Sequence, residues 1–319
     1  MIFIQKGENL VSTPVEPSLL SVDLGKTNSR IRLDDANGRV ERQGPGFPGF
    51  PVEDSVELAL AAIIPLVAAL GTDRLAGLVT IGVGAAGVDS DPVSARAFAL
   101  RLREHWDAEI AIASDVLTAH LGAFAGETGT VLIAGTGAVA YSIHGGEARR
   151  SDGWGPWLGD EGSGRWAGQI GLVCALRAAD GRGPATALEQ DARGLGADLS
   201  ADLSALPRAL TGGSDVARSL ASFAPTVFRR AAEGDGVASS IVDDAIAHLV
   251  ATTAAITVPG TPVSVVGGLA DDHEFLRRLL NELHRHRLRP HRPAGTPLDG
   301  AATLATRRDL PHERYVIRV

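Results

Sequence analysis

Short apolar runs separated by polar turns predict strands at the start of the chain. The run at 19–24 (LLSVDL) is typical of a strand, and the alternating segment 29–33 (SRIRL) is typical of its hairpin partner. The polar turn at 25–28 lies between them. A second turn at Asn37-Gly38 precedes a third short strand at 39–42. The pattern therefore predicts hairpin-linked strands.

Longer segments with helical spacing alternate with strands in the next part of the chain. Helices are predicted at 52–70, with a kink at Pro65, and at 92–106, where a proline lies in the opening turn. Strands are predicted at 76–81 and 109–113. These strand–helix units differ from the opening hairpins, and both kinds of connection are expected in one sheet.

The same pattern begins again near the middle of the chain. An apolar strand at 130–134 leads into the turn at 135–137 and a returning strand at 138–143. Each half therefore opens with a strand, a glycine-containing turn that carries threonine, and a second strand, which indicates an internal duplication. The hairpins and strand–helix units together predict an α/β fold with mixed sheets. Later predicted elements are a strand at 147–151, a helix at 163–179, a strand at 261–266 and a helix at 271–287.

Length, charge and cysteine content narrow the class of protein. A chain of 319 residues is long enough for two compact lobes. A formal net charge of −8 argues against nucleic acid as the main partner, and no apolar run is long enough for a membrane span. Cys174 is the only cysteine, so no disulfide forms within the chain. Residues 1–17 do not resemble a signal peptide and are expected to form a poorly ordered leader, so we expect a cytoplasmic protein.

The first turn is a candidate phosphate site. A turn with glycine and hydroxyl residues presents backbone N–H groups to an anion, here at Gly25, Thr27 and Asn28. Asp23 ends the preceding strand and can hold Mg²⁺ through water. Lys26 is one of only two lysines in a chain that otherwise uses arginine, which favours a compact charge for phosphate. An ordinary polar hairpin explains this turn equally well.

Two further glycine-rich segments have the same character. Gly135-Thr136-Gly137 occupies the equivalent turn of the second half, and two such turns are expected to face one cleft. Gly267-Gly268 ends a buried strand, where the absence of side chains allows adenine or ribose to approach the backbone. An ordinary hairpin and a tight strand–helix turn are the structural alternatives.

Asp115 is the candidate general base. It follows the strand at 109–113 directly, where open α/β sheets place residues that face ligands. A helix N-cap is the simpler interpretation of this residue alone, and capping does not exclude catalysis.

The loop at 153–163 combines aromatic, acidic and glycine residues. Trp154 offers a platform for a sugar ring, and Asp160 and Glu161 offer carboxylates that accept hydrogen bonds from sugar hydroxyls. A helix-entry loop with acids matched to the helix dipole explains Asp160 and Glu161 but not the glycines. The loop therefore indicates a sugar site.

These segments, in this order between about residues 20 and 306, resemble the N-acetylglucosamine kinase and BadF/BadG/BcrA/BcrD-type ATPase family of the actin/hexokinase superfamily. The most specific part is the series from Ser114-Asp115 through 135–137 to 153–163. The resemblance implies two ribonuclease-H-like (actin-like ATPase) lobes around a nucleotide cleft. Residues 1–115, with a C-terminal helix at 297–319 that returns to them, would form one lobe, and 116–296 the other.

The resemblance also implies a function: ATP-dependent phosphorylation of a primary hydroxyl of an amino sugar, N-acetylglucosamine or glucosamine, with Mg²⁺, by a cytoplasmic homodimer. Asp115 matches the catalytic base. The implied nucleotide-binding residues are Asp23, Gly25, Lys26, Thr27, Asn28, Gly135, Thr136, Gly137, Gly267 and Gly268, with Asp23 also next to Mg²⁺. The implied sugar-binding residues are Asp115, Gly137, Trp154, Asp160 and Glu161.

The chain departs from the family pattern at three places. In the first loop, Leu24 and Lys26 occupy positions where the family usually has glycines. Ala138-Val139 occupies a position where sugar kinases often have serine and a polar residue. Phe47 occupies a position near the sugar where asparagine is common. The identity of the sugar therefore stays open. Two alternative functions also remain. One is an activator ATPase, which needs more cysteines than Cys174 for its iron–sulfur cluster. The other is a non-catalytic sugar sensor.

Overall fold

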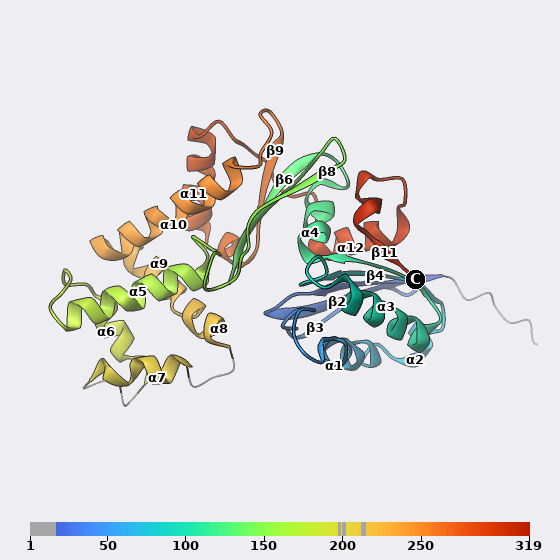
Figure 1. The fold of residues 1–319 in the computed structure, drawn as a ribbon, viewed down its shortest axis with the longest axis horizontal. Helices are drawn as coiled ribbons and strands as arrows, with labels where there is room; N and C mark the ends of the chain where they lie inside the picture. The colour runs from blue at the N-terminus through green and yellow to red at the C-terminus, as the bar shows by residue number, and fades with distance from the viewer. Residues whose placement is uncertain (1–16, 197–198, 200–201, 212–214) are drawn as a thin grey trace, which may run out of the picture.

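Two mixed sheets, each with its own helices, form the protein (Figure 1). The computed structural model describes residues 17–196, 199, 202–211 and 215–319, so the expected leader lies outside the described residues except for Pro17. The first sheet contains, in spatial order, β11 (Ile317–Arg318), β5 (Glu109–Ser114), β4 (Leu78–Ala85), β1 (Ser18–Leu24), β2 (Asn28–Asp35) and β3 (Gly38–Pro45). The second contains β10 (Arg289–Pro290), β9 (Pro262–Val266), β6 (Gly129–Ala134), β7 (Ala138–His144) and β8 (Glu147–Asp152).

The two sheets repeat one topology, as the sequence predicts. In the first, β1 pairs with β2 and β2 with β3 in antiparallel hairpins, while β4 lies parallel to β1 and β5 parallel to β4. In the second, β6, β7 and β8 form the antiparallel hairpins, and β9 and β10 add in parallel. Since β1 and β6 hold equivalent places, the turns that follow them are also equivalent.

Helices cover both faces of the first sheet. One face packs on α1 (Ser55–Ala68) and α3 (Pro92–Trp106), with the short α2 (Thr72–Leu75) leading into β4. The other face packs on α4 (Asp115–Phe124) and α12 (Pro297–Thr306). Strands covered on both faces are apolar almost throughout, which explains the continuous run in β1. The predicted helix at 92–106 is confirmed, and α1 continues through Pro65.

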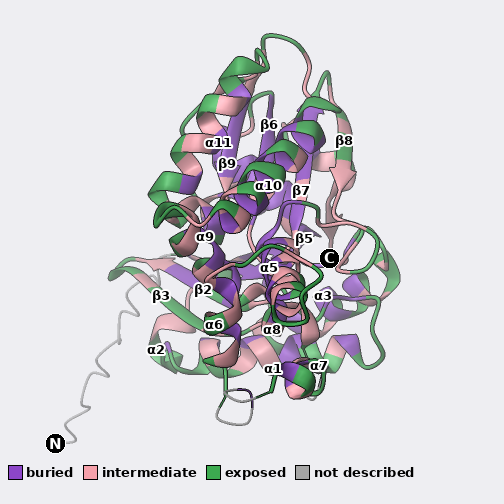
Figure 2. Cartoon of the chain, turned by 90° about the vertical axis from the view of Figure 1, so that its left-hand side faces the viewer, coloured by how far each residue is buried: buried purple, intermediate pink, exposed green. Residues whose placement is uncertain are grey.

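The helices that cover the second sheet come between β8 and β10 in the sequence, and they form a larger layer than the helices of the first sheet. Figure 2 shows their outer faces exposed and the strands β6, β7 and β9 buried behind them. The helices are α5 (Gly164–Ala179), α6 (Leu188–Arg193), α7 (Leu206–Thr211), α8 (Val216–Ala221), α9 (Ala224–Ala232), α10 (Gly236–Ala254) and α11 (His273–Arg285). None of the helices in the described ranges has the length and apolar character that crossing a bilayer requires.

Glycines at two positions explain why β4 runs four residues beyond the predicted strand end at 81. A Cβ at Gly82 would lie 2.0 Å from the Ala301 carbonyl oxygen, and one at Gly84 would lie 2.0 Å from Thr118 Oγ1. The strand therefore needs glycine where α12 and α4 cross it closely. A glycine-rich continuation reads as a turn in the sequence, which is why the prediction ended too early.

The C-terminal helix expected at 297–319 is shorter than predicted. It ends at Thr306, and residues 311–315 form a 3-10 turn before β11 pairs antiparallel with β5. Pro311 cannot continue a helix, and Ile317 instead packs on the core of the first sheet. Figure 1 accordingly shows the C-terminus beside β4. At its other end α12 is tied to β2, because the buried guanidinium of Arg32 donates to Asp299 at 2.7 Å.

Candidate active site

The two glycine- and threonine-containing turns meet. Thr27, between β1 and β2, donates its hydroxyl to Thr136 Oγ1, between β6 and β7, at 3.3 Å. The start of α5 fixes the second turn, since Gly164 N–H donates to the Gly135 carbonyl and Arg165 N–H to the Thr136 carbonyl. Residues 109 positions apart are therefore brought to one point between the sheets, as the duplicated pattern predicts.

Backbone donors are unused at both turns. In the described part of the chain, the N–H groups of Lys26 and Thr27 donate to no other group, and the same holds for Thr136 and Gly137. Successive free N–H groups in a tight turn attract an anion. The arrangement is therefore suited to a phosphate chain lying across both turns.

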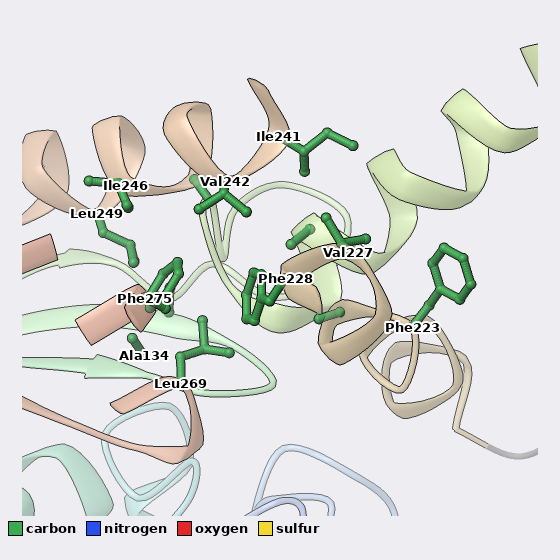
Figure 3. Close-up of a cluster of buried hydrophobic side chains, with 14 of the residues drawn as sticks. Ala134, Phe223, Val227, Phe228, Ile241, Val242, Ile246, Leu249, Leu269 and Phe275 are labelled. Carbon is green, nitrogen blue, oxygen red and sulfur yellow. The ribbon is translucent and has the colours of Figure 1, made fainter. Parts of the chain in front are cut away.

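A cavity of about 930 Å³ opens from these turns into the second half of the molecule. Its far wall is apolar: Phe228 of α9 and Phe275 of α11 stack with ring centroids 4.9 Å apart, and Leu269 lies beside them (Figure 3). A flat apolar wall at one end and turn backbone at the other suit a heterocyclic base and a phosphate chain. The lining residues that carry the argument are Thr27, Asn28, Gly135, Thr136, Gly268 and Phe275.

The two glycines after β9 have different roles. Gly267 has φ 102°, and a Cβ there would lie 2.5 Å from the Ala134 carbonyl oxygen, so it allows the chain to pass close to β6. Gly268 lines the cavity, and a Cβ there would meet nothing within 4 Å. Of the predicted pair, the structure places Gly268 against the cavity.

Asp115 begins α4 immediately after β5 and lies outside the cavity lining, beside the first turn. Its Oδ1 accepts the N–H of Val116 at 2.9 Å, which is a local capping contact. Burial and the nearby charge of Asp23 raise the pKa of Asp115 from 3.8 to about 6. A carboxylate with a pKa near neutrality is suited to accept a proton during catalysis.

Asp23 is buried at the end of β1, and its surroundings are compatible with a water-mediated contact to Mg²⁺. Arg30, its partner across the β1–β2 ladder, donates to Asp23 Oδ2 at 2.6 Å. Asp23 Oδ1 accepts no hydrogen bond from the described residues. Nowhere in the described ranges do three or more metal-ligating side chains gather. Mg²⁺ commonly binds through one carboxylate, water and substrate phosphates, which is what one free carboxylate oxygen allows.

Asp160 lies at the second turn. Its Oδ1 accepts the Ala138 N–H at 3.3 Å, and its Oδ2 would lie 3.0 Å from a Cβ at Gly137. Burial raises the pKa of Asp160. The positive charge of Lys26 lies near enough to both Asp160 and Asp115 to favour their ionised forms. The carboxylates of Asp115 and Asp160 thus both lie within the electrostatic reach of the Lys26 ammonium, and none of these three residues belongs to the cavity lining.

Two predicted sugar-binding side chains contact other residues in this structure. Glu161 faces α10, where His248 Nδ1 lies 3.5 Å from its carboxylate. Trp154 is 71% exposed, and the Arg150 guanidinium lies 5.7 Å from its ring centroid. Among the described residues no hydrogen bond, ion pair or ring contact joins either side chain to Asp115. Phe47, at the position where the family often has asparagine, is fully buried against Phe50.

Sequence reasoning missed the cavity wall. The residues concerned come from α8, α9 and the segment after β9, where the sequence shows helical spacing without a chemical motif. Small and aromatic residues on an amphipathic helix are also typical of an ordinary core, so no signal marked them. They are Ala221, Ala224, Pro225, Phe228, Leu269 and Phe275.

Comparisons with known proteins agree with this geometry. A model of the BadF/BadG/BcrA/BcrD ATPase family matches residues 20–305. A Chromobacterium violaceum structure, assigned provisionally as an N-acetylglucosamine kinase, is 26% identical, with a TM-score of 0.73 over 91% of this chain and 99% of that one. A Streptomyces griseus glucokinase of the ROK family, solved with glucose and AMPPNP, shares the fold at 18% identity and a TM-score of 0.53 over 90% and 99%.

One curated relative matches over a shorter range. The N-acetylmuramic acid/N-acetylglucosamine kinase of Clostridium acetobutylicum is 41% identical over 86 residues, which are 27% of this chain. The match spans 26% of the length of that relative.

Proposed function

Because the chain belongs to the BadF/BadG/BcrA/BcrD ATPase family, we propose that it is an ATP-dependent sugar kinase that phosphorylates a primary hydroxyl of an amino sugar, N-acetylglucosamine or glucosamine. Two similar proteins named for N-acetylglucosamine kinase activity support this choice of sugar. The observation that carries the proposal is the 3.3 Å contact between Thr27 and Thr136, where a cavity with an apolar wall opens from the two turns. The charge of Lys26, in the first turn, also reaches both Asp115 and Asp160.

In this proposal the nucleotide fills the cavity. Its base lies against Phe228 and Phe275, and its phosphates accept the free N–H groups of the two turns. Asp23 would hold Mg²⁺ through water, and the ion would supply positive charge next to the phosphates when bound. Positioning and charge neutralisation supply most of the acceleration in phosphoryl transfer.

The sugar lies on the other side of the turns. Asp160 accepts a hydrogen bond from one of its hydroxyls and Asp115 from the primary hydroxyl. As the hydroxyl oxygen bonds to the γ-phosphorus, Asp115 takes the hydroxyl proton, and the bond between the γ-phosphorus and its bridging oxygen breaks to release ADP. Asp115, Asp160 and the Gly137 backbone therefore share the sugar side of the site.

The test of this function is ADP release measured with Mg·ATP and one acceptor at a time: glucosamine, N-acetylglucosamine, N-acetylmannosamine, glucose, or buffer alone. We expect release well above the buffer rate with N-acetylglucosamine or glucosamine. Equal release with and without every acceptor would show an ATPase that uses no sugar. If release is fastest with glucose, the protein is a sugar kinase, but the proposed amino sugar is not its preferred substrate.

The pH profile tests the role of Asp115. Since only the ionised carboxylate accepts a proton, kcat/KM for the sugar should fall about tenfold per pH unit below an apparent pKa of about 6. A phosphate also titrates near pH 6, so a second variant identifies the group. The exposed Asp89 carboxylate helps to raise the pKa of Asp115. Asp89→Asn should therefore move the acid limb slightly to lower pH, and a limb that moves to higher pH would contradict the role of Asp115.

A further inference from the structure

A side chain from the helical layer of the second half reaches across to the first turn. Arg218 lies in α8, and its Nη2 donates to the Thr27 carbonyl oxygen at 2.9 Å. Figure 1 shows α8 opposite the ends of β2 and β3, on the far side of the space between the two halves. The contact joins residues 191 positions apart. Together with the Thr27–Thr136 contact, it joins the first turn to two separate segments of the second half.

Arg218 itself is not among the residues that line the cavity, but it bonds to one of them, Thr27. Ala221, one helical turn further along α8, lines the cavity, as does Thr27. Asp215, the N-cap of α8, steadies the guanidinium through Nε at 3.3 Å. The side chain is half-exposed, so it can turn without disturbing the core. A guanidinium in this place has further N–H donors for phosphate oxygens.

The arginines of the cavity lining are engaged in ion pairs, as Arg218 is with Asp215. Arg229 pairs with Asp191 and Glu233, and Arg278 with Asp243. Both residues lie on helices of the apolar end, α9 and α11. A nucleoside triphosphate brings several negative charges to the two turns. Arg218 differs from these two arginines in that its guanidinium bonds directly to the first turn.

We propose that Arg218 binds the phosphate chain of the nucleotide, and that its bond to the Thr27 carbonyl is the resting contact from which the guanidinium turns to the phosphates. The inference rests on the proposed function for the presence of the nucleotide. The 3.3 Å separation of Thr27 and Thr136 must widen for phosphate oxygens to lie between the hydroxyls. When the turns separate, the Thr27 carbonyl moves and Arg218 exchanges a neutral acceptor for a charged one, which makes a stronger hydrogen bond.

The experiment compares nucleotides with and without phosphate. Dissociation constants for ATP, ADP and adenosine are measured by titration calorimetry in the presence of Mg²⁺, for the wild type, Arg218→Ala and Arg218→Lys. We expect Arg218→Ala to weaken ATP and ADP about tenfold and to leave adenosine unchanged, since a charged hydrogen bond is lost only with phosphate. Arg218→Lys should retain part of the affinity for ATP and ADP that Arg218→Ala loses. Arg182→Ala is the matched control, because Arg182 is an exposed arginine paired with a nearby aspartate, Asp180.

The outcomes separate this inference from the function it rests on. If Arg218→Ala weakens adenosine as much as ATP, or leaves ATP binding unchanged while the wild type prefers ATP over adenosine, the phosphate role of Arg218 is overturned and the kinase stands. If the wild type binds ATP no better than adenosine, both are overturned. A tenfold loss confined to the phosphorylated ligands supports the inference.

Discussion

Replacing Asp115 by asparagine is expected to lower kcat for sugar phosphorylation by about 10²–10⁴-fold, the contribution of a positioned general base. The amide is similar in size and cannot take the hydroxyl proton. Because Asp115 lies outside the cavity lining, the dissociation constant for ATP should stay near the wild-type value. Steady-state ADP release with saturating sugar gives kcat, and calorimetry gives the ATP affinity.

Asp89→Asn is the matched control for this substitution. It removes the same charge from an exposed residue whose field reaches Asp115, and it should leave kcat at neutral pH close to that of the wild type. A near-normal kcat in Asp115→Asn would remove Asp115 from the chemistry. A loss of ATP binding in that variant would instead show that Asp115 supports the nucleotide site.

Filling the cavity through Gly268 should produce the second large effect. A Cβ at this position meets nothing within 4 Å, so Gly268→Leu adds its side chain to the cavity without displacing the backbone. Forcing a ligand against added methylenes costs about 1–3 kcal/mol, which is about 10- to 100-fold in the dissociation constant. We therefore expect ATP, ADP and adenosine to weaken together, measured by calorimetry, with an unchanged melting temperature.

Gly236→Leu provides the comparison for Gly268→Leu. Gly236 begins α10, lies outside the cavity lining, and likewise has nothing within 4 Å of an added Cβ. Nucleotide binding should be unaffected in this variant. Wild-type affinity for ATP in Gly268→Leu would place the nucleotide outside the cavity.

Much of the fold could be predicted from local sequence patterns. The strand–turn–strand openings of both halves, and the helix at 92–106, follow from apolar alternation and from proline and turn residues that act over a few positions. The meeting of Thr27 and Thr136 followed from the repeat, since equivalent turns of duplicated sheets face each other. The end of the C-terminal helix could not be predicted in this way, because the pairing of β11 with β5 is a contact between distant segments.

The candidate site was predictable where motifs lie in turns and not where it depends on packing. Asp115 and Asp160 follow strand and loop signals, and the charge of Lys26 reaches both. Phe228, Phe275 and Arg218 lie on helices whose spacing is that of any buried layer. Only the tertiary arrangement brings the two phenylalanines to the cavity and Arg218 to the first turn. Trp154 carries a suitable ring, yet its loop directs it to solvent in this structure.

A structure of the protein with Mg²⁺, a non-hydrolysable ATP analogue and N-acetylglucosamine tests the central claim most directly. The account predicts the base against Phe228 and Phe275, the γ-phosphate between the turns of Thr27 and Thr136, and the primary sugar hydroxyl within hydrogen-bonding distance of the Asp115 carboxylate. A nucleotide bound outside the cavity, or a sugar hydroxyl separated from Asp115 by the turns themselves, would contradict it.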